Sequence, residues 1–149
     1  MNRFTAAFAL AAAFAAGCGA THFLRPALAA ENITAQVIST GELEGDKISP
    51  LNTGGMRNKV LAVADGMTIS IQDGSPPKHM HPNTHEIQYV LEGTGTIWLG
   101  DKEVTVKPGD LVIIPKGTAH AGTKPQGRTI KALAIKTPPQ APDDIKLLN

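Results

Sequence analysis

Cysteine and aromatic residues are scarce in this chain and unevenly placed. Its 149 residues include one cysteine, Cys18, one tryptophan, one tyrosine and four phenylalanines, and every phenylalanine lies within the first 23 residues. If those first residues are removed, no thiol remains, which excludes disulfides as a source of stability. The core must then be built mainly from Val, Ile, Leu and Met side chains.

The chain also lacks an excess of charge of either sign. It has 14 Lys and Arg against 13 Asp and Glu, a formal net charge of +1. This balance argues against a strongly basic nucleic-acid binder, so we expect no nucleic-acid partner. With 42% hydrophobic residues, 15 glycines and 11 prolines, the composition is typical of one globular domain rich in turns.

Residues 1–29 differ in kind from the rest. They combine a basic start at Arg3, an apolar, Ala-rich run over 4–16 and a small-x-small site, Ala27-Leu28-Ala29, without an acidic residue. This pattern predicts a secretory signal peptide cleaved before Ala30 and a periplasmic or secreted protein. Two alternatives stay open: an uncleaved membrane anchor, or a lipoprotein cleavage box over 15–18 with Cys18 lipidated. Only these alternatives predict attachment to a membrane.

Short apolar-alternating runs divided by turn residues follow an irregular segment, 30–58. They predict strands over 59–64, 67–72, 86–91, 94–99, 103–107, 111–114 and 129–136, with a further strand over 36–39. Asp65-Gly66 is a strong two-residue hairpin signal. Because no helical period of useful length occurs, we expect an all-β fold, an antiparallel sandwich or small barrel over 59–136. The Pro-rich stretch 137–149 reads as an extended tail that straps the domain or stays loose.

Histidines gather near the predicted turns. His79 and His81 are two residues apart, so in a strand both rings project from one face. Glu86 opens the next predicted strand, and His120 comes from a later hairpin. Three imidazoles and a carboxylate suit one divalent transition metal ion, Fe, Mn, Co, Ni, Cu or Zn, better than calcium or magnesium, which prefer oxygen.

Two runs around these residues resemble the paired motifs of the cupin superfamily. The first is GSPPKHMHPNTHE over 74–86, followed after six residues by Gly93, and the second is GDLVIIPKGTAH over 109–120. The first run is one residue short between its glycine and histidine, and Lys124 stands where the second motif commonly ends in Asn. The resemblance covers 60–136 and implies a small β-barrel or jelly roll that pairs as a homodimer. It also implies metal ligands at His79, His81, Glu86 and His120.

Other side chains near the motifs have expected places. Gln88 and Val90 share the face of Glu86 and are expected to line a substrate pocket, whereas His85 points to the opposite face and reads as a rim residue. Three loop lysines could attract an anionic substrate, although solvated lysines are the default. These are Lys78, Lys116 and Lys124. Gly93, Gly109 and Gly117 serve backbone geometry, and Tyr89 and Trp98 serve packing.

Four protein ligands leave positions on the metal for water, dioxygen or a bidentate substrate. The first hypothesis is therefore a metal-dependent enzyme that acts on a small oxygen-bearing substrate by a dioxygenase, lyase or isomerase reaction, with Glu86 as catalytic base. The second is a non-catalytic cupin that binds or senses a metal or a small chelating molecule. The ligand set does not choose between these chemistries.

Overall fold

The computed structural model describes residues 33–149 of the chain. Residues 1–29, with the expected cleavage site and Cys18, lie outside the described residues, so those expectations stay predictions. Within the described part, no helix is long and apolar enough to span a membrane. Two short 3-10 helices, η1 (Thr40–Glu42) and η2 (Gly45–Lys47), precede the strands.

The described part is all-β, as the sequence predicts. Its strands are β1 (Met56–Ala64), β2 (Met67–Gly74), β3 (His79–Met80), β4 (His85–Glu92), β5 (Gly95–Leu99), β6 (Lys102–Val106), β7 (Leu111–Ile114), β8 (His120–Pro125), β9 (Ile130–Thr137) and β10 (Lys146–Leu147). Each strand expected between 59 and 136 is present within a few residues of its predicted bounds. β3, β8 and β10 are additional.

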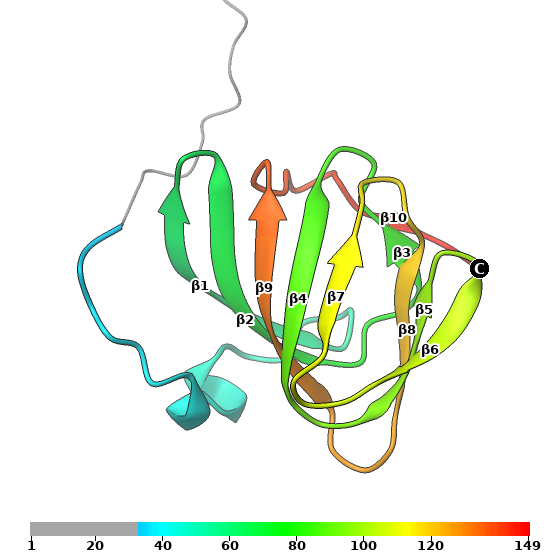
Figure 1. Ribbon diagram of the computed structural model, residues 1–149, viewed down its shortest axis with the longest axis horizontal. Coiled ribbons are helices and arrows are strands. Elements are labelled where there is room, and N and C mark those ends of the chain that lie inside the picture. The colour runs from blue at the N-terminus through cyan, green and yellow to red at the C-terminus, as the bar shows by residue number, and fades with distance from the viewer. Residues whose placement is uncertain (1–32) are drawn as a thin grey trace, which may run out of the picture.

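The strands form two antiparallel sheets that face each other as a flattened barrel (Figure 1). One sheet has the order β1-β2-β9-β4-β7 and the other β10-β3-β8-β5-β6. Figure 1 shows the first sheet running across the molecule from β1 to β7, with the second sheet beside β7. Apart from the β1-β2 and β5-β6 hairpins, neighbours in each sheet are not consecutive in the chain, so the fold brings both predicted motif runs to the space between the sheets.

The tight turns form where the sequence places them. Asp65 and Gly66 join β1 to β2 with φ angles of 48° and 71°, the pair of positive values that a type I′ hairpin requires. Gly93 has a φ of 81°, and a Cβ added to it would lie 2.2 Å from the carbonyl oxygen of Thr129. Its expected role in backbone geometry follows from this close approach.

The strand expected over 36–39 is wrong. These residues form no ladder with another strand, and Val37 is 96% exposed. An apolar alternation becomes a strand only where a neighbouring strand pairs with it, and this run pairs with no strand of the described residues, although β1 is an edge strand. The chain contacts β1 further on, after η2 begins, where Lys59 Nζ donates to the carbonyl of Lys47 at 3.1 Å and Ile48 is buried.

The hydrophobic core occupies part of the space between the sheets. It consists of aliphatic side chains from both sheets, Val90, Ile97, Val106, Val112 and Ile114. Each fully buried side chain of this kind contributes about 1.5–3 kcal/mol to folding. Among the described residues the packing is aliphatic, as the composition predicts, and the rest of the space between the sheets is left for a cavity.

Candidate metal centre

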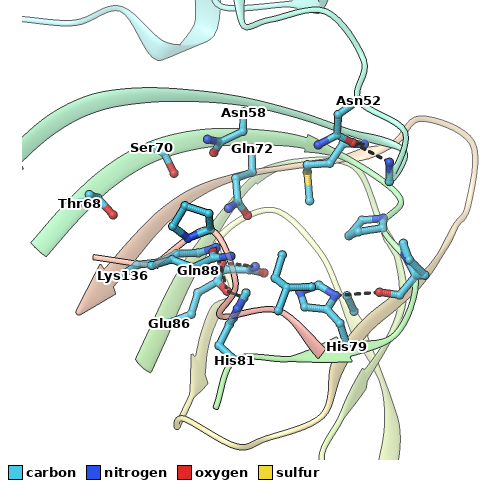
Figure 2. A pocket seen from close by; sticks show the side chains of 18 of the residues that line it. Asn52, Asn58, Thr68, Ser70, Gln72, His79, His81, Glu86, Gln88 and Lys136 are labelled. Atoms are coloured by element: carbon cyan, nitrogen blue, oxygen red, sulfur yellow. Dashed lines mark hydrogen bonds and ion pairs between the residues drawn. The ribbon is translucent and has the colours of Figure 1, made fainter. Parts of the chain in front are cut away.

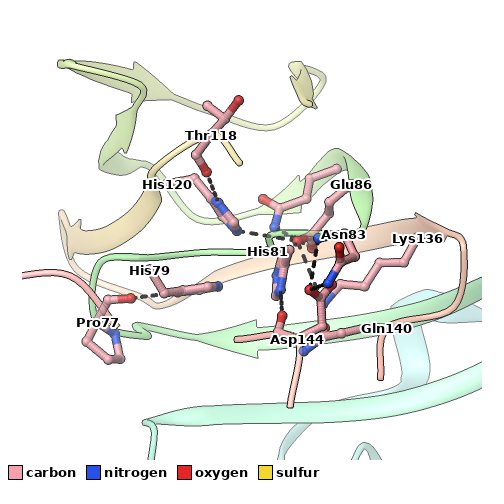
Figure 3. A network of polar contacts seen from close by, with 11 residues as sticks. Pro77, His79, His81, Asn83, Glu86, Thr118, His120, Lys136, Gln140 and Asp144 are labelled. Atoms are coloured by element: carbon pink, nitrogen blue, oxygen red, sulfur yellow. Dashed lines mark hydrogen bonds and ion pairs between the residues drawn. The ribbon is translucent and has the colours of Figure 1, made fainter. Parts of the chain in front are cut away.

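Three buried imidazoles meet between the sheets, and each is oriented by a backbone carbonyl (Figure 3). Nδ1 of His79 donates to Pro77 O at 2.8 Å, Nδ1 of His81 to Asp144 O at 2.6 Å, and Nδ1 of His120 to Thr118 O at 2.9 Å. A carbonyl oxygen only accepts, so the proton of each neutral ring sits on Nδ1. Nε2 of each ring therefore carries a free lone pair.

These lone pairs point into one small volume. The ligand atoms of His79, His81 and His120 lie within 4.8 Å of one another, and the ring centroids are 4.3–5.0 Å apart. Within residues 33–149, Nε2 of His81 and Nε2 of His120 are buried without a hydrogen-bond donor. The carbonyl partners on Nδ1 are the outer contacts that orient histidine ligands on metals. This buried cluster can hold a metal ion.

The carboxylate of Glu86 lies beside the same histidine lone pairs. Its Oε2 lies 3.2 Å from Nε2 of His81 and 3.4 Å from Nε2 of His120, and its side chain is 2% exposed. An ionised carboxylate facing two imidazole lone pairs is repulsive unless a proton or a cation lies between them. A single divalent cation would satisfy all of these atoms at once, so the donor set fits a transition metal ion.

Charges around Glu86 keep it ionised. Burial acts to raise the pKa of the Glu86 carboxyl, but hydrogen bonds from His120 and His81 when Nε2 of these rings is protonated, the charge of Lys136 and a hydrogen bond from Gln88 hold that pKa well below its usual range. The Gln88 amide donates to Oε1 of Glu86 at 2.9 Å. Glu86 is thus fixed as an anion with one oxygen turned toward the histidines.

Unlike Glu86, which stays charged, His79 is held in its neutral form by burial. Removal from water lowers the pKa of His79 to about 4, and the nearby His120 and His81 rings add to this effect. The hydrogen bond to the Pro77 carbonyl and the charge of Glu86 offset only part of it. Near pH 7 the ring therefore presents its Nε2 lone pair, the form that coordinates a metal.

A cavity of about 470 Å³ opens beside the cluster (Figure 2). His79, His81 and Glu86 line it, and Lys136 on β9 reaches into it next to Glu86. Nζ of Lys136 lies 3.7 Å from Oε2 of Glu86 and donates to the Gln140 side-chain oxygen. Burial lowers the pKa of Lys136, while the negative charges of Glu86 and Asp144 raise it in part. The volume suits a small molecule.

Gln88 and Val90, the two residues expected to line the pocket, differ in their distance from the larger cavity. Gln88 lines the 470 Å³ cavity. Val90 is 1% exposed, packs in the hydrophobic core and borders a separate cavity of about 30 Å³, so it lies below the larger cavity rather than in its wall. His85 is exposed at the rim, where its Nδ1 accepts from the Lys116 backbone N–H at 3.3 Å.

The three loop lysines do not line the larger cavity. Lys124 forms an ion pair with Glu103, Lys78 lies over the Trp98 ring at 3.7 Å, and Lys116 is exposed. Trp98 thus packs as expected, with a cation above its face. The cation at the site is Lys136, which the sequence reasoning missed.

Lys136 and Asp144 are the site residues that sequence reasoning did not find. A signal for Lys136 existed, because strand alternation puts it on the same face as Ala132 and Ala134. No comparable signal existed for Asp144, which contributes a backbone carbonyl from the Pro-rich tail. The tail lies along the site as a strap, in which β10 pairs with β3.

The comparisons with known proteins agree with this geometry. Residues 67–136 match the cupin domain family. Uncharacterized protein MJ1618 of Methanocaldococcus jannaschii is 31% identical over 126 residues, which are 78% of this chain and 98% of that protein. The chain belongs to the cupin superfamily, and the resemblance found in the motif runs is confirmed.

A curated enzyme and a solved structure are also similar. Quercetin 2,3-dioxygenase of Bacillus subtilis is 31% identical over 93 residues, 57% of this chain and 26% of that enzyme, so the chain spans about a quarter of its length. An uncharacterized conserved protein with a double-stranded β-helix domain from Klebsiella pneumoniae superposes with a TM-score of 0.60 at 17% identity, covering 78% of this chain and 99% of that one. The fold is the cupin double-stranded β-helix.

Proposed function

We propose that this cupin is a metal-dependent enzyme that acts on a small oxygen-bearing molecule by a dioxygenase, lyase or isomerase reaction. The observation that carries the proposal is the convergence of three imidazole lone pairs and one ionised carboxylate at the wall of a 470 Å³ cavity. His79, His81, Glu86 and His120 would hold one divalent transition metal ion, Fe, Mn, Co, Ni, Cu or Zn. When bound, the ion would polarise a substrate oxygen or support dioxygen chemistry.

The remaining steps belong to the protein's own side chains. The carbonyls of Pro77, Asp144 and Thr118 hold the imidazoles in the neutral, metal-binding tautomer. Gln88 anchors Oε1 of Glu86, and Oε2, which faces the histidines, would accept a proton from a substrate in the cavity after leaving the ion. Glu86 is therefore proposed as both metal ligand and catalytic base.

The proposal has support from dioxygenases among the relatives, of which the quercetin 2,3-dioxygenase is one. Because this chain spans about a quarter of that enzyme, the reaction type and substrate do not transfer from it. We also propose that residues 1–29 direct export to the periplasm or outside the cell. The intact mass of the protein from its native host tests this, since a mass that retains Met1 contradicts cleavage.

Metal reconstitution followed by turnover tests the enzyme proposal. The purified chain would be loaded in turn with Fe, Mn, Co, Ni, Cu and Zn, and metal per chain would be measured by elemental analysis. Diketones, flavonols, hydroxy acids and sugar acids would then be assayed. We expect one metal per chain and turnover within this panel, with His85→Ala as the matched control that keeps both. A chain that binds none of the six metals contradicts the centre. Metal without turnover favours a binding or sensing protein.

A further inference from the structure

Polar side chains in the wall of the large cavity lack partners. Ser70 and Gln72 on β2 line this cavity, and the two residues are only 4% and 8% exposed. Neither side chain is hydrogen-bonded to another of residues 33–149. Their hydroxyl and amide atoms are not buried without a partner and face the cavity, where a ligand oxygen could replace water. This wall is therefore suited to a ligand that carries hydroxyl or carbonyl oxygens.

The sheet register places this polar wall next to the metal centre. Lys136 lies between Thr68 and Glu86 in one row across β2, β9 and β4. In the next row on the same face, Ala134 lies between Ser70 and Gln88. Ala134 is small and fully buried, and polar groups flank it on both sides. In Figure 2 the labelled side chains of Ser70, Gln72 and Lys136 belong to this wall. One small molecule could contact the wall and the metal together.

The charges around the cavity favour an anion. Glu86 and Lys136 are the charged residues among those that line it, and Lys136 has a side chain only 12% exposed. With a divalent ion in place, the ion and the Lys136 ammonium bring three positive charges. They face one negative charge on Glu86 and one on Asp144, which lies behind His81. A buried excess of positive charge is unfavourable unless an anion pairs with it.

Aromatic surface is missing from the same cavity. Tyr89 and Trp98 are not among its lining residues, and its only rings besides proline are imidazoles of the metal centre. A flat aromatic ligand would find no face on which to stack. Hydrogen-bonding groups and charge thus add selectivity to a wall that also contains aliphatic and proline side chains.

We propose that the cavity binds a small hydroxylated carboxylate, of the hydroxy acid or sugar acid class, with its carboxylate on Lys136 and its hydroxyl groups on Ser70 and Gln72. This inference rests on the proposed metal-dependent function and specifies its substrate class. Lys136 is then the residue that selects anions, and the two β2 side chains select hydroxyl groups over methylene groups.

Isothermal titration calorimetry of the zinc-loaded chain tests this proposal with four probes. Gluconate carries a carboxylate and hydroxyl groups, and sorbitol carries hydroxyl groups without a carboxylate. Hexanoate carries a carboxylate without hydroxyl groups, and catechol is a flat aromatic chelator. We expect gluconate to bind at least about tenfold more tightly than each of the others, because a charge-assisted hydrogen bond adds to the neutral ones. Equal affinity for gluconate and sorbitol, or tighter binding of catechol, would overturn the proposal.

Variants assign the selectivity to particular residues. Lys136→Met should weaken gluconate at least about tenfold and leave sorbitol and the zinc content unchanged. Lys124→Met is the matched control, because Lys124 is exposed on β8 and pairs with Glu103 outside the cavity. Gln72→Leu tests the hydroxyl contacts without changing charge and should weaken gluconate but not hexanoate. Circular dichroism verifies that each variant is folded.

The outcomes for the metal centre and for the substrate class are separable. If the wild-type chain holds one zinc ion but wild type and Lys136→Met bind gluconate equally well, the substrate class is contradicted and the metal centre is not. If the wild-type chain holds no metal but binds gluconate more tightly than Lys136→Met does, the metal centre is contradicted and the anion site is supported.

Discussion

The backbone carbonyl of Asp144 accepts a hydrogen bond from Nδ1 of His81 at 2.6 Å, although 63 positions separate the two residues. The Asp144 side chain ties the same tail to the loop after His81, because its Oδ1 accepts from the backbone N–H of Asn83 at 2.9 Å and from Nδ2 of Asn83 at 3.0 Å. A ligand of the candidate metal centre is thus oriented by the C-terminal strap, residues 138–149.

Loss of this strap should weaken metal binding. Asp144→Ala removes the tie to Asn83, so the carbonyl on His81 is held less firmly, and outer contacts of this kind typically contribute about 10–100-fold in metal affinity. We expect a loss of roughly tenfold for Asp144→Ala and more for a chain that ends at Thr137. The exposed neighbour variant Asp143→Ala is the control. Competition with a chromophoric chelator measures the affinities, and a folded truncated chain with wild-type affinity would refute the role of the strap.

Substitution of the proposed ligands should separate metal binding from activity. His81→Ala and His120→Ala each remove a buried imidazole and should lose most of the metal, a larger effect than the roughly 10–100-fold typical of outer contacts. Glu86→Gln should keep metal but lose activity, since an amide cannot accept the substrate proton as a carboxylate does. Elemental analysis of each variant provides the readout, with His85→Ala as the rim control. Full metal content in His81→Ala would exclude this histidine as a ligand.

The sequence predicts much of this architecture because its signals are local. Alternation and turn pairs such as Asp65-Gly66 act within a few residues, so the strands and the hairpin follow from them. The histidine and glutamate set is recognised through motif spacing, which also implies the barrel. Val90 shows the limit of alternation, because a period of two gives the face of a strand and not the depth of the side chain.

The remaining features depend on contacts between segments that are distant in the sequence. Asp144 acts on His81 through a backbone carbonyl, which every residue possesses, and the contact crosses half of the domain. Lys136 becomes part of the site because β9 pairs between β2 and β4, an order that local patterns do not encode. The run over 36–39 alternates like a strand, but no neighbouring strand pairs with it.

The homodimer expected from the family resemblance stays a prediction, and one face of the first sheet offers a way to test it. Leu111 and Ile113 on β7 are 60% and 61% exposed, and Tyr89 beside Leu111 is 43% exposed. Side chains of this size exposed together mark a candidate contact surface. We expect the wild-type chain to be a dimer by light scattering at tens of micromolar and Ile113→Lys to shift it toward monomer. The exposed Val37→Lys is the control, and a monomeric wild-type chain would contradict pairing.

The metal-free chain should lose stability as the pH falls from about 6.5 to 4. Because burial lowers the pKa of His79 to about 4, the unfolded chain binds a proton at this residue near its ordinary pKa of 6.5, before the folded chain does. The lowered pKa of Glu86 acts in the same direction from about 4.5 downward. The contribution of His79 is complete above pH 6.5 and decreases below it, with a slope of up to about 1.4 kcal/mol per pH unit.

Urea unfolding of metal-free wild type and His79→Gln at several pH values between 7.5 and 4 measures this effect. The free energy of unfolding of wild type should decrease with acidification, and the His79→Gln variant should show a shallower decrease, because it has no imidazole to protonate. Added metal should raise stability most at neutral pH and least in acid, since protons compete for the same nitrogen atoms. Identical slopes for the two chains would show that burial does not hold His79 neutral, and would contradict the assignment of this ring as a neutral metal ligand.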